Sequence, residues 1–300
     1  MCGIAGVWLP GRPRAALATL VEGMARTIVH RGPDHGASFI DAEAGLALAY
    51  RRLAVIDTSP EGNQPMVSRC GRYVLVFNGE LYNAADLRAA HLAGQPLRGH
   101  SDTEVLVEVI ARRGVEATLP ALNGMYAFAL WDRPRRRLTL ARDHVGIKPL
   151  YWLQTPEGVV FGSELRCLMA APVWERRIDR AALGAFLRHN YVPAPHTIFA
   201  GVRKLEPGRA VTIGPGGAAE PFRHWDFDRV AREGLADPLP AGEDAAADAL
   251  DALLRDAVGR QMVADVPLGA FLSGGIDSST VVAVMQALSP RPVRTFSIGF

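Results

Sequence analysis

The sequence opens with MCGIAGVW, residues 1–8, which places a cysteine directly before a short apolar segment. Because the side chain after Met1 is small, we expect Met1 to be removed and Cys2 to carry both a thiol and a free α-amine. An α-amine titrates near about 7.7–8.0, so part of it is neutral at pH 7 and can accept a proton. A thiol is intrinsically very nucleophilic. Cys2 therefore predicts a nucleophile with its own base, acting through a bridging water; the alternative is a small apolar residue that begins a strand.

The bulk composition predicts a globular protein. A chain of 300 residues can hold two domains, or one domain and a substantial part of another. It is 49% hydrophobic and 21% charged, and its net charge of +2 predicts no nucleic-acid or membrane partner. The sequence lacks a secretory signal pattern and any run of about 18 apolar residues. Its three cysteines show neither disulfide nor zinc spacing, so we expect a reduced, cytoplasmic protein without a metal site of its own.

Residues 1–212 alternate several strand-like segments with a few helical ones. Apolar residues recur at helical spacing between residues 17 and 28 and between residues 105 and 110, where Ser101-Asp102 predicts the helix start. Strands are expected at residues 4–8, 46–50, 53–56, 73–77, 125–131, 138–141, 150–153 and 159–161. Many strands with few helices favour a layered α+β domain.

The pattern changes in the last third of the sequence. Residues 213–242 contain a Gly/Pro turn and little periodicity, and we interpret them as a linker. Residues 243–300 then predict a long helix, a strand at 266–272, a helix at 277–288 and a strand at 293–298, which form a βαβ unit of a parallel sheet. Two strands cannot bury both faces of such a sheet, so we expect residues 243–300 to be the first part of a larger domain or to need a partner.

The loop inside that βαβ unit has the sequence SGGIDSS, residues 273–279. Its glycines let the backbone approach an anion, and the following helix offers unpaired N–H groups. The loop matches neither GxxxxGK[ST] nor GxGxxG. It resembles the pyrophosphate loop of ATP pyrophosphatases, which cleave ATP between its α and β phosphates. The resemblance implies an ATP-binding set made of Leu272, Ser273, Gly274, Gly275, Asp277, Ser278 and Ser279.

The N-terminal segment with Cys2 and the loop at residues 273–279 together resemble the glutamine-hydrolysing asparagine synthetase family. The motifs that carry the resemblance are MCGIAG at 1–6, HRGPD at 30–34, RLAVID at 52–57, NGELYN at 78–83, SDTE at 101–104, RDHVGIKPLY at 142–151 and SEL at 163–165. The resemblance implies an α+β N-terminal nucleophile (class II glutamine amidotransferase) sandwich at residues 1–212. It also implies the start of an α/β ATP-pyrophosphatase synthetase domain, with a parallel sheet, at residues 243–300.

Hydrolysis of an amide needs a group that stabilises the oxyanion. Asn78 and Gly79 follow the expected strand at 73–77, where an amide side chain and a backbone N–H can converge on one point. The resemblance makes them the oxyanion hole, and Cys2 the nucleophile that forms a glutamyl thioester. The alternative for Asn78-Gly79 is a hairpin turn, which could also present these donors.

Glutamine also presents an α-carboxylate and an α-ammonium group. Arg52 offers a bidentate fork for the carboxylate and Asp102 a counter-charge for the ammonium, and the resemblance assigns them these roles with Glu80 beside the substrate. Arg51 competes with Arg52, but the family pattern places the arginine directly before the leucine. Taken alone, Asp102 is explained as a carboxylate that stabilises a helix N-terminus.

The implied activity is glutamine-dependent asparagine synthesis. ATP, L-aspartate and L-glutamine would give L-asparagine, L-glutamate, AMP and diphosphate, with Mg²⁺ accompanying ATP; a homodimer is left open. One alternative is an amidotransferase of the same architecture that acts on another carboxylate, since no residue here selects the acceptor. Another is a glutaminase-only module or structural fragment that needs a partner. The roles of residues 30–34 and of Lys148 are left unassigned.

Overall fold

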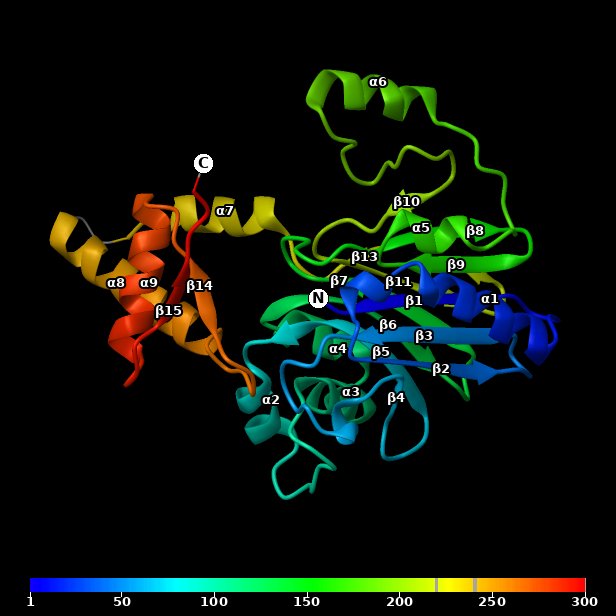
Figure 1. Cartoon of the computed structure of the whole chain (residues 1–300), viewed down its shortest axis with the longest axis horizontal. Helices are drawn as coiled ribbons and strands as arrows, with labels where there is room; N and C mark the ends of the chain where they lie inside the picture. Colours follow the sequence, from blue (N-terminus) through cyan, green and yellow to red (C-terminus); the bar gives the residue numbers. More distant parts are fainter. Residues whose placement is uncertain (219–220, 240–241, 300) are drawn as a thin grey trace. The chain divides into compact units, whose positions relative to one another are not determined.

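The computed structural model describes residues 1–218, 221–239 and 242–299 (Figure 1). The chain divides into two compact units. Unit 1 comprises Met1–Ala54 and Ser59–Phe227, and unit 2 comprises Val55–Thr58 and Asp228–Phe300. The boundaries expected at residues 212 and 242 stay predictions.

Unit 1 is built on two antiparallel sheets. The first has the strand order β10-β8-β9-β1-β3-β2, with the bounds β1 (Gly3–Trp8), β2 (His35–Asp41), β3 (Leu46–Arg52), β8 (Tyr151–Thr155), β9 (Gly158–Gly162) and β10 (Arg203–Lys204). The second has the order β12-β11-β7-β6-β5-β4, with β13 beside β11 and the bounds β4 (Met66–Val67), β5 (Tyr73–Leu81), β6 (Gly124–Asp132), β7 (Arg137–Arg142), β11 (Arg209–Gly214), β12 (Gly217–Ala218) and β13 (Phe222–Arg223).

The helices of unit 1 lie on the outer faces of these sheets or beyond them. Their bounds are α1 (Arg14–Arg26), α2 (Ala84–His91), α3 (Asp102–Arg113), α4 (Val115–Thr118), α5 (Leu165–Met169) and α6 (Arg180–His189). Apolar residues of α1 and α5 pack against the first sheet, and apolar residues of α3 pack against the second. Long loops lead to and from α6 (Figure 1).

The alternation of side chains along β1 explains the layers. Ile4 and Trp8 belong to the core between the two sheets, whereas Ala5 and Val7 pack with α1 on the other face. Successive side chains of a strand point to opposite faces, so a wholly apolar strand is buried on both sides. Unit 1 is therefore a helix–sheet–sheet–helix sandwich, as the α+β pattern predicted.

Three local predictions for residues 1–242 are wrong. Residues 53–56 form no strand, because the backbone of Leu53 is directed to a cysteine side chain instead of a neighbouring strand. Asn78 and Gly79 do not follow the strand or form a turn; they lie inside β5, opposite Ala127 and Tyr126 of β6. The stretch expected to lack periodicity contains α7 (Phe227–Ala236), with an exposed ion pair one turn apart between Arg229 and Glu233.

Unit 2 contains the predicted βαβ arrangement. After α8 (Glu243–Arg260) come β14 (Gly269–Phe271), α9 (Ile276–Leu288) and β15 (Arg294–Phe296), and the two strands are parallel. Both strands are shorter than expected. Among the described residues, no helix is long and apolar enough to cross a membrane.

Candidate active site

The Cys2 sulfur lies against the end of β3. The Tyr50 hydroxyl donates a hydrogen bond to Cys2 Sγ at 2.8 Å, and the backbone N–H of Leu53 approaches the same sulfur at 3.4 Å. The sulfur also lies 3.5 Å from the carbonyl oxygen of Leu53, to which the thiol can donate. The register of β1 and β3, in which Ile4 pairs with Tyr50, produces this arrangement. Cys2 is partly buried, so the thiol is held in place and still accessible.

Arg31 holds the backbone of Cys2. Its Nε donates to the Cys2 carbonyl oxygen at 2.9 Å, and its Nη1 lies 3.0 Å from Glu164 Oε1. His30 Nε2 lies 2.9 Å from the same carboxylate oxygen. Burial disfavours ionisation of Glu164, but the hydrogen bonds from His30 and Arg31 outweigh it and lower the pKa of Glu164. The first two residues of the 30–34 motif therefore hold the backbone of Cys2.

The rest of the same motif fixes the end of β3. A side chain at position 32 would place its Cβ 2.3 Å from the Arg51 carbonyl carbon, so only glycine allows this close approach. The N–H of Asp34 donates to the Arg52 carbonyl oxygen at 3.0 Å, and its Oδ2 accepts from the Ala54 N–H at 2.8 Å. Residues 30–34, unassigned from the sequence, thus support both Cys2 and the segment around Arg52.

The two adjacent arginines lie on different faces of β3. Tyr50 and Arg52 share the face that bears the sulfur, because alternate residues of a strand point the same way. Arg52 is 5% exposed, and its Nη1 donates to the Ser59 carbonyl oxygen at 2.9 Å and to Asn63 Oδ1 at 2.7 Å. Arg51 Nη1 would collide with a Cβ at Gly36 on β2, which places Arg51 on the outer face. This geometry favours Arg52 as the glutamine ligand.

Asp102 is the first residue of α3 and is 7% exposed. Its Oδ2 accepts a hydrogen bond from the Leu81 N–H at 2.8 Å. Ser101 caps the helix by accepting from the Glu104 N–H at 3.2 Å, as predicted. Burial raises the pKa of Asp102 to about 6, although the hydrogen bonds from Leu81 and Thr103 act against this rise.

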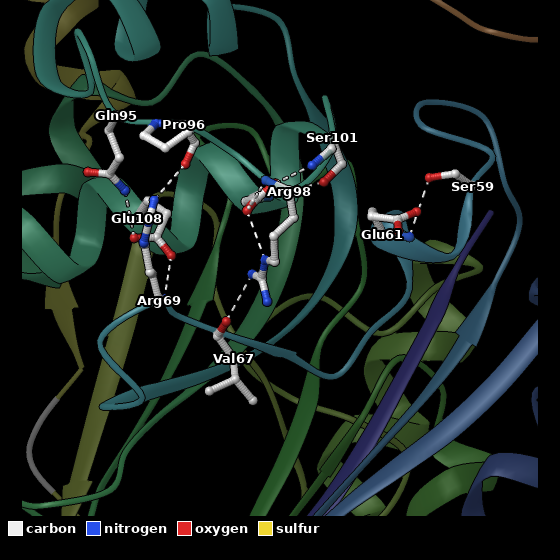
Figure 2. Close-up of polar contacts among 11 residues, drawn as sticks. Ser59, Glu61, Val67, Arg69, Gln95, Pro96, Arg98, Ser101 and Glu108 are labelled. Atoms are coloured by element: carbon white, nitrogen blue, oxygen red, sulfur yellow. Dashed lines mark hydrogen bonds and ion pairs between the residues drawn. The ribbon is translucent and has the colours of Figure 1, made fainter.

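Two glutamates of α3 hold the loops that flank it (Figure 2). The Glu104 carboxylate accepts from Arg98 Nε at 2.9 Å, and Arg98 Nη2 donates to the Val67 carbonyl oxygen at 3.0 Å. Glu108 accepts from the Arg69 N–H at 2.6 Å and from Gln95 Nε2 at 3.0 Å. These contacts fix the start of α3 and with it Asp102.

Asn78, Gly79 and Glu80 are consecutive residues of β5. The Asn78 side chain is 1% exposed, and its Nδ2 has no hydrogen-bond partner among the described residues. A Cβ at Gly79 would lie 2.3 Å from the Met125 carbonyl oxygen, so β5 and β6 approach closely there. Burial raises the pKa of Glu80 to about 7; the Asp102 charge acts in the same direction and Lys148 against it.

Lys148 is a buried residue whose role the sequence left open. It is 5% exposed, and Asp143 holds its loop by accepting from the Lys148 N–H at 2.9 Å. Burial lowers the pKa of Lys148, and the charge of Arg31 acts in the same direction, whereas Cys2, Glu80 and Asp143 raise it. The Lys148 ammonium group therefore interacts electrostatically with both Cys2 and Glu80.

The predicted glutamine-site residues come together around the sulfur. Tyr50 interacts electrostatically with Cys2, Arg52 and Asp102, and Lys148 connects Cys2 with Glu80. Asn78 and Gly79 directly precede Glu80 on β5. A small zwitterion with a hydrolysable amide requires groups of the kinds found here. They are a thiol, an arginine, two carboxylates and a buried amide donor.

The predicted phosphate loop is described within unit 2. Gly274 has a positive φ of 82°, and Gly275 is the N-cap of α9. Ser273 Oγ and Ser278 Oγ lie 3.0 Å apart, which closes the loop over the first turn of the helix. A Cβ added at Gly274 would meet nothing within 4 Å, so an anion has room beside the backbone. The remaining predicted ATP ligands, Leu272, Asp277 and Ser279, belong to the same segment.

Comparison with known proteins places this arrangement in a family. Residues 1–225 match the glutamine amidotransferase domain model, and residues 249–300 match the asparagine synthase model. The chain belongs to the glutamine amidotransferase family. The sandwich of unit 1 lies within the residues that match the family's domain.

Relatives extend the similarity over the whole chain. Glutamine-hydrolysing asparagine synthetase 1 of Bacillus subtilis is 38% identical over 303 residues, covering 100% of this chain and 46% of the relative. Asparagine synthetase 3 of the same organism is 35% identical over 309 residues, covering 100% and 48%. The chain therefore spans about half the length of the curated relatives it matches, and the predicted resemblance to this family is confirmed.

A solved structure supports the fold. Glutamine phosphoribosylpyrophosphate amidotransferase of B. subtilis, complexed with ADP and GMP, superposes with a TM-score of 0.55 at 20% identity, covering 99% of this chain and 65% of that one. At this identity the likeness concerns the fold alone. It confirms the predicted α+β sandwich fold.

Proposed function

We propose that this amidotransferase hydrolyses L-glutamine at Cys2 and that the ammonia serves ATP-dependent synthesis of L-asparagine from L-aspartate. The observation that carries the proposal is the convergence of buried groups on the Cys2 sulfur, which lies 2.8 Å from the Tyr50 hydroxyl. The names of the relatives support aspartate as the acceptor. The products would be asparagine, glutamate, AMP and diphosphate.

Glutamine binding follows from the charges of the site. Arg52 would bind the α-carboxylate, and Asp102 and Glu80 would face the α-ammonium. With a pKa of about 6, Asp102 is largely ionised at pH 7, whereas Glu80, with a pKa of about 7, is about half ionised. The two carboxyl groups therefore carry between one and two negative charges, enough to balance one ammonium group.

The acylation step uses Cys2, which directly precedes β1, and groups of β5. The Cys2 sulfur attacks the amide carbon, the carbon–nitrogen bond breaks, and the thiol proton leaves with the ammonia. Asn78 Nδ2, buried without a described partner, and Gly79 would stabilise the oxyanion. Burial lowers the pKa of the α-amine at Met1; Arg31 and Lys148 act in the same direction, whereas Cys2 and Asp34 raise it. The Cys2 α-amine exposed by loss of Met1 would meet the same cationic groups, which favour its neutral, basic form.

ATP is the co-substrate that we assign to residues 272–279, with Mg²⁺ as its counter-ion. The open backbone beside Gly274 and the N-terminus of α9 suit a phosphate chain. ATP activates the acceptor carboxylate as an acyl-adenylate, which ammonia attacks. We place the reaction in the cytoplasm and leave a homodimer open.

Substitution of the cysteines tests the glutamine half of the proposal. Cys2→Ala should abolish glutamate release from glutamine, because no nucleophile remains. Cys70→Ala, at an exposed cysteine, is the matched control and should keep the rate within about twofold. Mass spectrometry of active protein should show that Met1 is absent. Glutamine hydrolysis by Cys2→Ala would refute the mechanism, and an active chain that retains Met1 would remove the α-amine from it.

A further inference from the structure

We propose that the Tyr50 hydroxyl is a catalytic group of the glutamine-hydrolysing site, which donates a hydrogen bond to Cys2 Sγ and stabilises the sulfur anion when the thioester breaks. The inference rests on the proposed function, since it requires Cys2 to be the nucleophile. Neither the thiol pattern nor the family motifs single out Tyr50. The Tyr50 hydroxyl contacts the reacting sulfur directly, and this contact does not require bound substrate.

The geometry fixes the hydroxyl against the sulfur. Their separation is 2.8 Å, and Tyr50 is 3% exposed. The ring belongs to the core between the two sheets, and the residue pairs with Ile4 in the register of β1 and β3. A close-packed core allows a ring little movement. The hydroxyl therefore stays in contact with the sulfur through the reaction cycle.

Tyr50 is suited to donate a proton and unsuited to remove one. Burial raises its pKa well above the usual value; the Cys2 charge and hydrogen bond act in the same direction, while the Arg52 charge opposes them. The hydroxyl therefore keeps its hydrogen at neutral pH. Leu53 N–H, 3.4 Å from the sulfur, is a second and longer donor. Together the two donors form a partial shell for a thiolate.

The hydrogen bond from Tyr50 should lower the barrier most for hydrolysis of the glutamyl thioester. The water oxygen bonds to the acyl carbon, and the carbon–sulfur bond breaks with its electron pair on Sγ. The thiolate accepts the hydrogen bond from Tyr50 and then takes up the proton that the water lost. Glutamate leaves and the thiol is restored, so no further reactant is consumed. Donors directed at an atom where charge develops lower the barrier for that step.

A purely structural role for this hydroxyl is the competing explanation. Tyr126 argues against it, because its hydroxyl is buried and has no hydrogen-bond partner among the described residues. The same sandwich therefore folds around a tyrosine oxygen without such a contact. A structural role would change stability and leave the reactivity of the sulfur unaltered, so the two roles can be separated.

Steady-state kinetics of Tyr50→Phe give the first test. A hydrogen bond to a charged group changes an equilibrium by roughly ten- to a hundredfold, so kcat for glutamine hydrolysis should fall by about that factor. KM should stay within about twofold, since Tyr50 is not a glutamine ligand. Tyr73→Phe, at a tyrosine 5% exposed at the start of β5, is the matched control and should keep both constants.

Alkylation by iodoacetamide gives a second test that needs no glutamine. Loss of the donor lowers the thiolate fraction but makes each thiolate more nucleophilic, with a Brønsted slope of about 0.4–0.5, so Cys2 should react roughly three- to tenfold more slowly. Cys70 is exposed and serves as the internal control, because its rate should not change. Peptide mapping by mass spectrometry separates the two sites.

The outcomes distinguish this inference from the function on which it rests. Failure of the unsubstituted chain to hydrolyse glutamine would refute the proposed function. A chain that hydrolyses glutamine, with unchanged kcat and Cys2 alkylation in Tyr50→Phe, would refute the role of Tyr50. If Tyr50→Phe lacks a cooperative thermal transition, 3-fluorotyrosine at position 50 keeps the ring and supplies a stronger donor. It should speed Cys2 alkylation, and an unchanged rate would overturn the inference.

Discussion

The Asp102 carboxylate should reduce the stability of unit 1 at neutral pH. Burial raises its pKa from the usual 3.8 to about 6. Between these values the unfolded chain has lost a proton that the folded chain still holds, so stability is complete below about pH 4 and falls as the pH rises through the window. A difference of about 2 in pKa, at about 1.36 kcal/mol each, gives a loss of about 3 kcal/mol above pH 6.

The substitution Asp102→Asn should remove this loss of stability at neutral pH. The amide oxygen can still accept from the Leu81 N–H, and the side chain no longer ionises. We compare the free energies of unfolding of variant and parent at pH 4.5 and pH 7.5. The variant should gain about 2 kcal/mol relative to the parent between these values, since part of the window lies below pH 4.5. The comparison cancels any effect of the substitution that does not depend on pH.

Glu80 should increase the stability that Asp102→Asn gains over the parent between pH 4.5 and pH 7.5. Part of its raised pKa comes from the Asp102 charge, which the asparagine lacks. Urea unfolding followed by tryptophan fluorescence measures the effect in unit 1 alone, because all five tryptophans, at positions 8, 131, 152, 174 and 225, belong to it. The variant should also bind glutamine roughly ten- to a hundredfold more weakly. If variant and parent differed in stability by the same amount at both pH values, the buried Asp102 charge would carry no cost. An unchanged KM for glutamine would refute the role of Asp102 as a ligand.

Three further predictions test other parts of the structure. Arg52→Ala should raise KM for glutamine roughly ten- to a hundredfold, whereas Arg51→Ala, on the outer face, should not; the reverse would move the carboxylate ligand to Arg51. Gly79→Ala should destabilise unit 1 by about 1–3 kcal/mol or more through the clash with Met125, while Gly23→Ala, open on α1, should be neutral or stabilising by up to about 1 kcal/mol. Limited proteolysis should cut residues 228–299 first, because Val284 and Met285 are the buried apolar side chains described there; equal resistance of residues 1–227 would contradict this.

The sequence predicted those parts of the site whose chemistry is local. A cysteine at position 2, a Gly/Ser loop before a helix and a Ser-Asp helix start each carry their meaning within a few residues. The sandwich was predictable because strands buried on both faces leave continuous apolar runs, as in β1. The helix α7 was missed although Phe227, Val230 and Leu235 recur at helical spacing along it; all three side chains are exposed.

Contacts set by strand pairing could not be read from the sequence. Asn78-Gly79 is a strong local turn signal, yet pairing with β6 continues β5 through both residues. Tyr50 lies 48 residues from Cys2 and reaches its sulfur only because Ile4 pairs with Tyr50. Lys148 reaches the site through a loop whose shape Asp143 fixes by accepting two backbone hydrogen bonds. For Asn78-Gly79 and for Tyr50 a long-range strand register decides, and local preference does not.

The segment after β3 shows how the fold and the site constrain each other. Its apolar residues favour a strand, but the Leu53 N–H and carbonyl groups, which a strand would pair with its neighbour, are directed at the Cys2 sulfur. The Ala54 N–H is likewise bound by Asp34. At this exposed position the Cys2 sulfur and the Asp34 carboxylate contact the backbone groups that a neighbouring strand would otherwise bind. A local prediction that fails beside a reactive side chain is therefore itself a sign of where the chemistry lies.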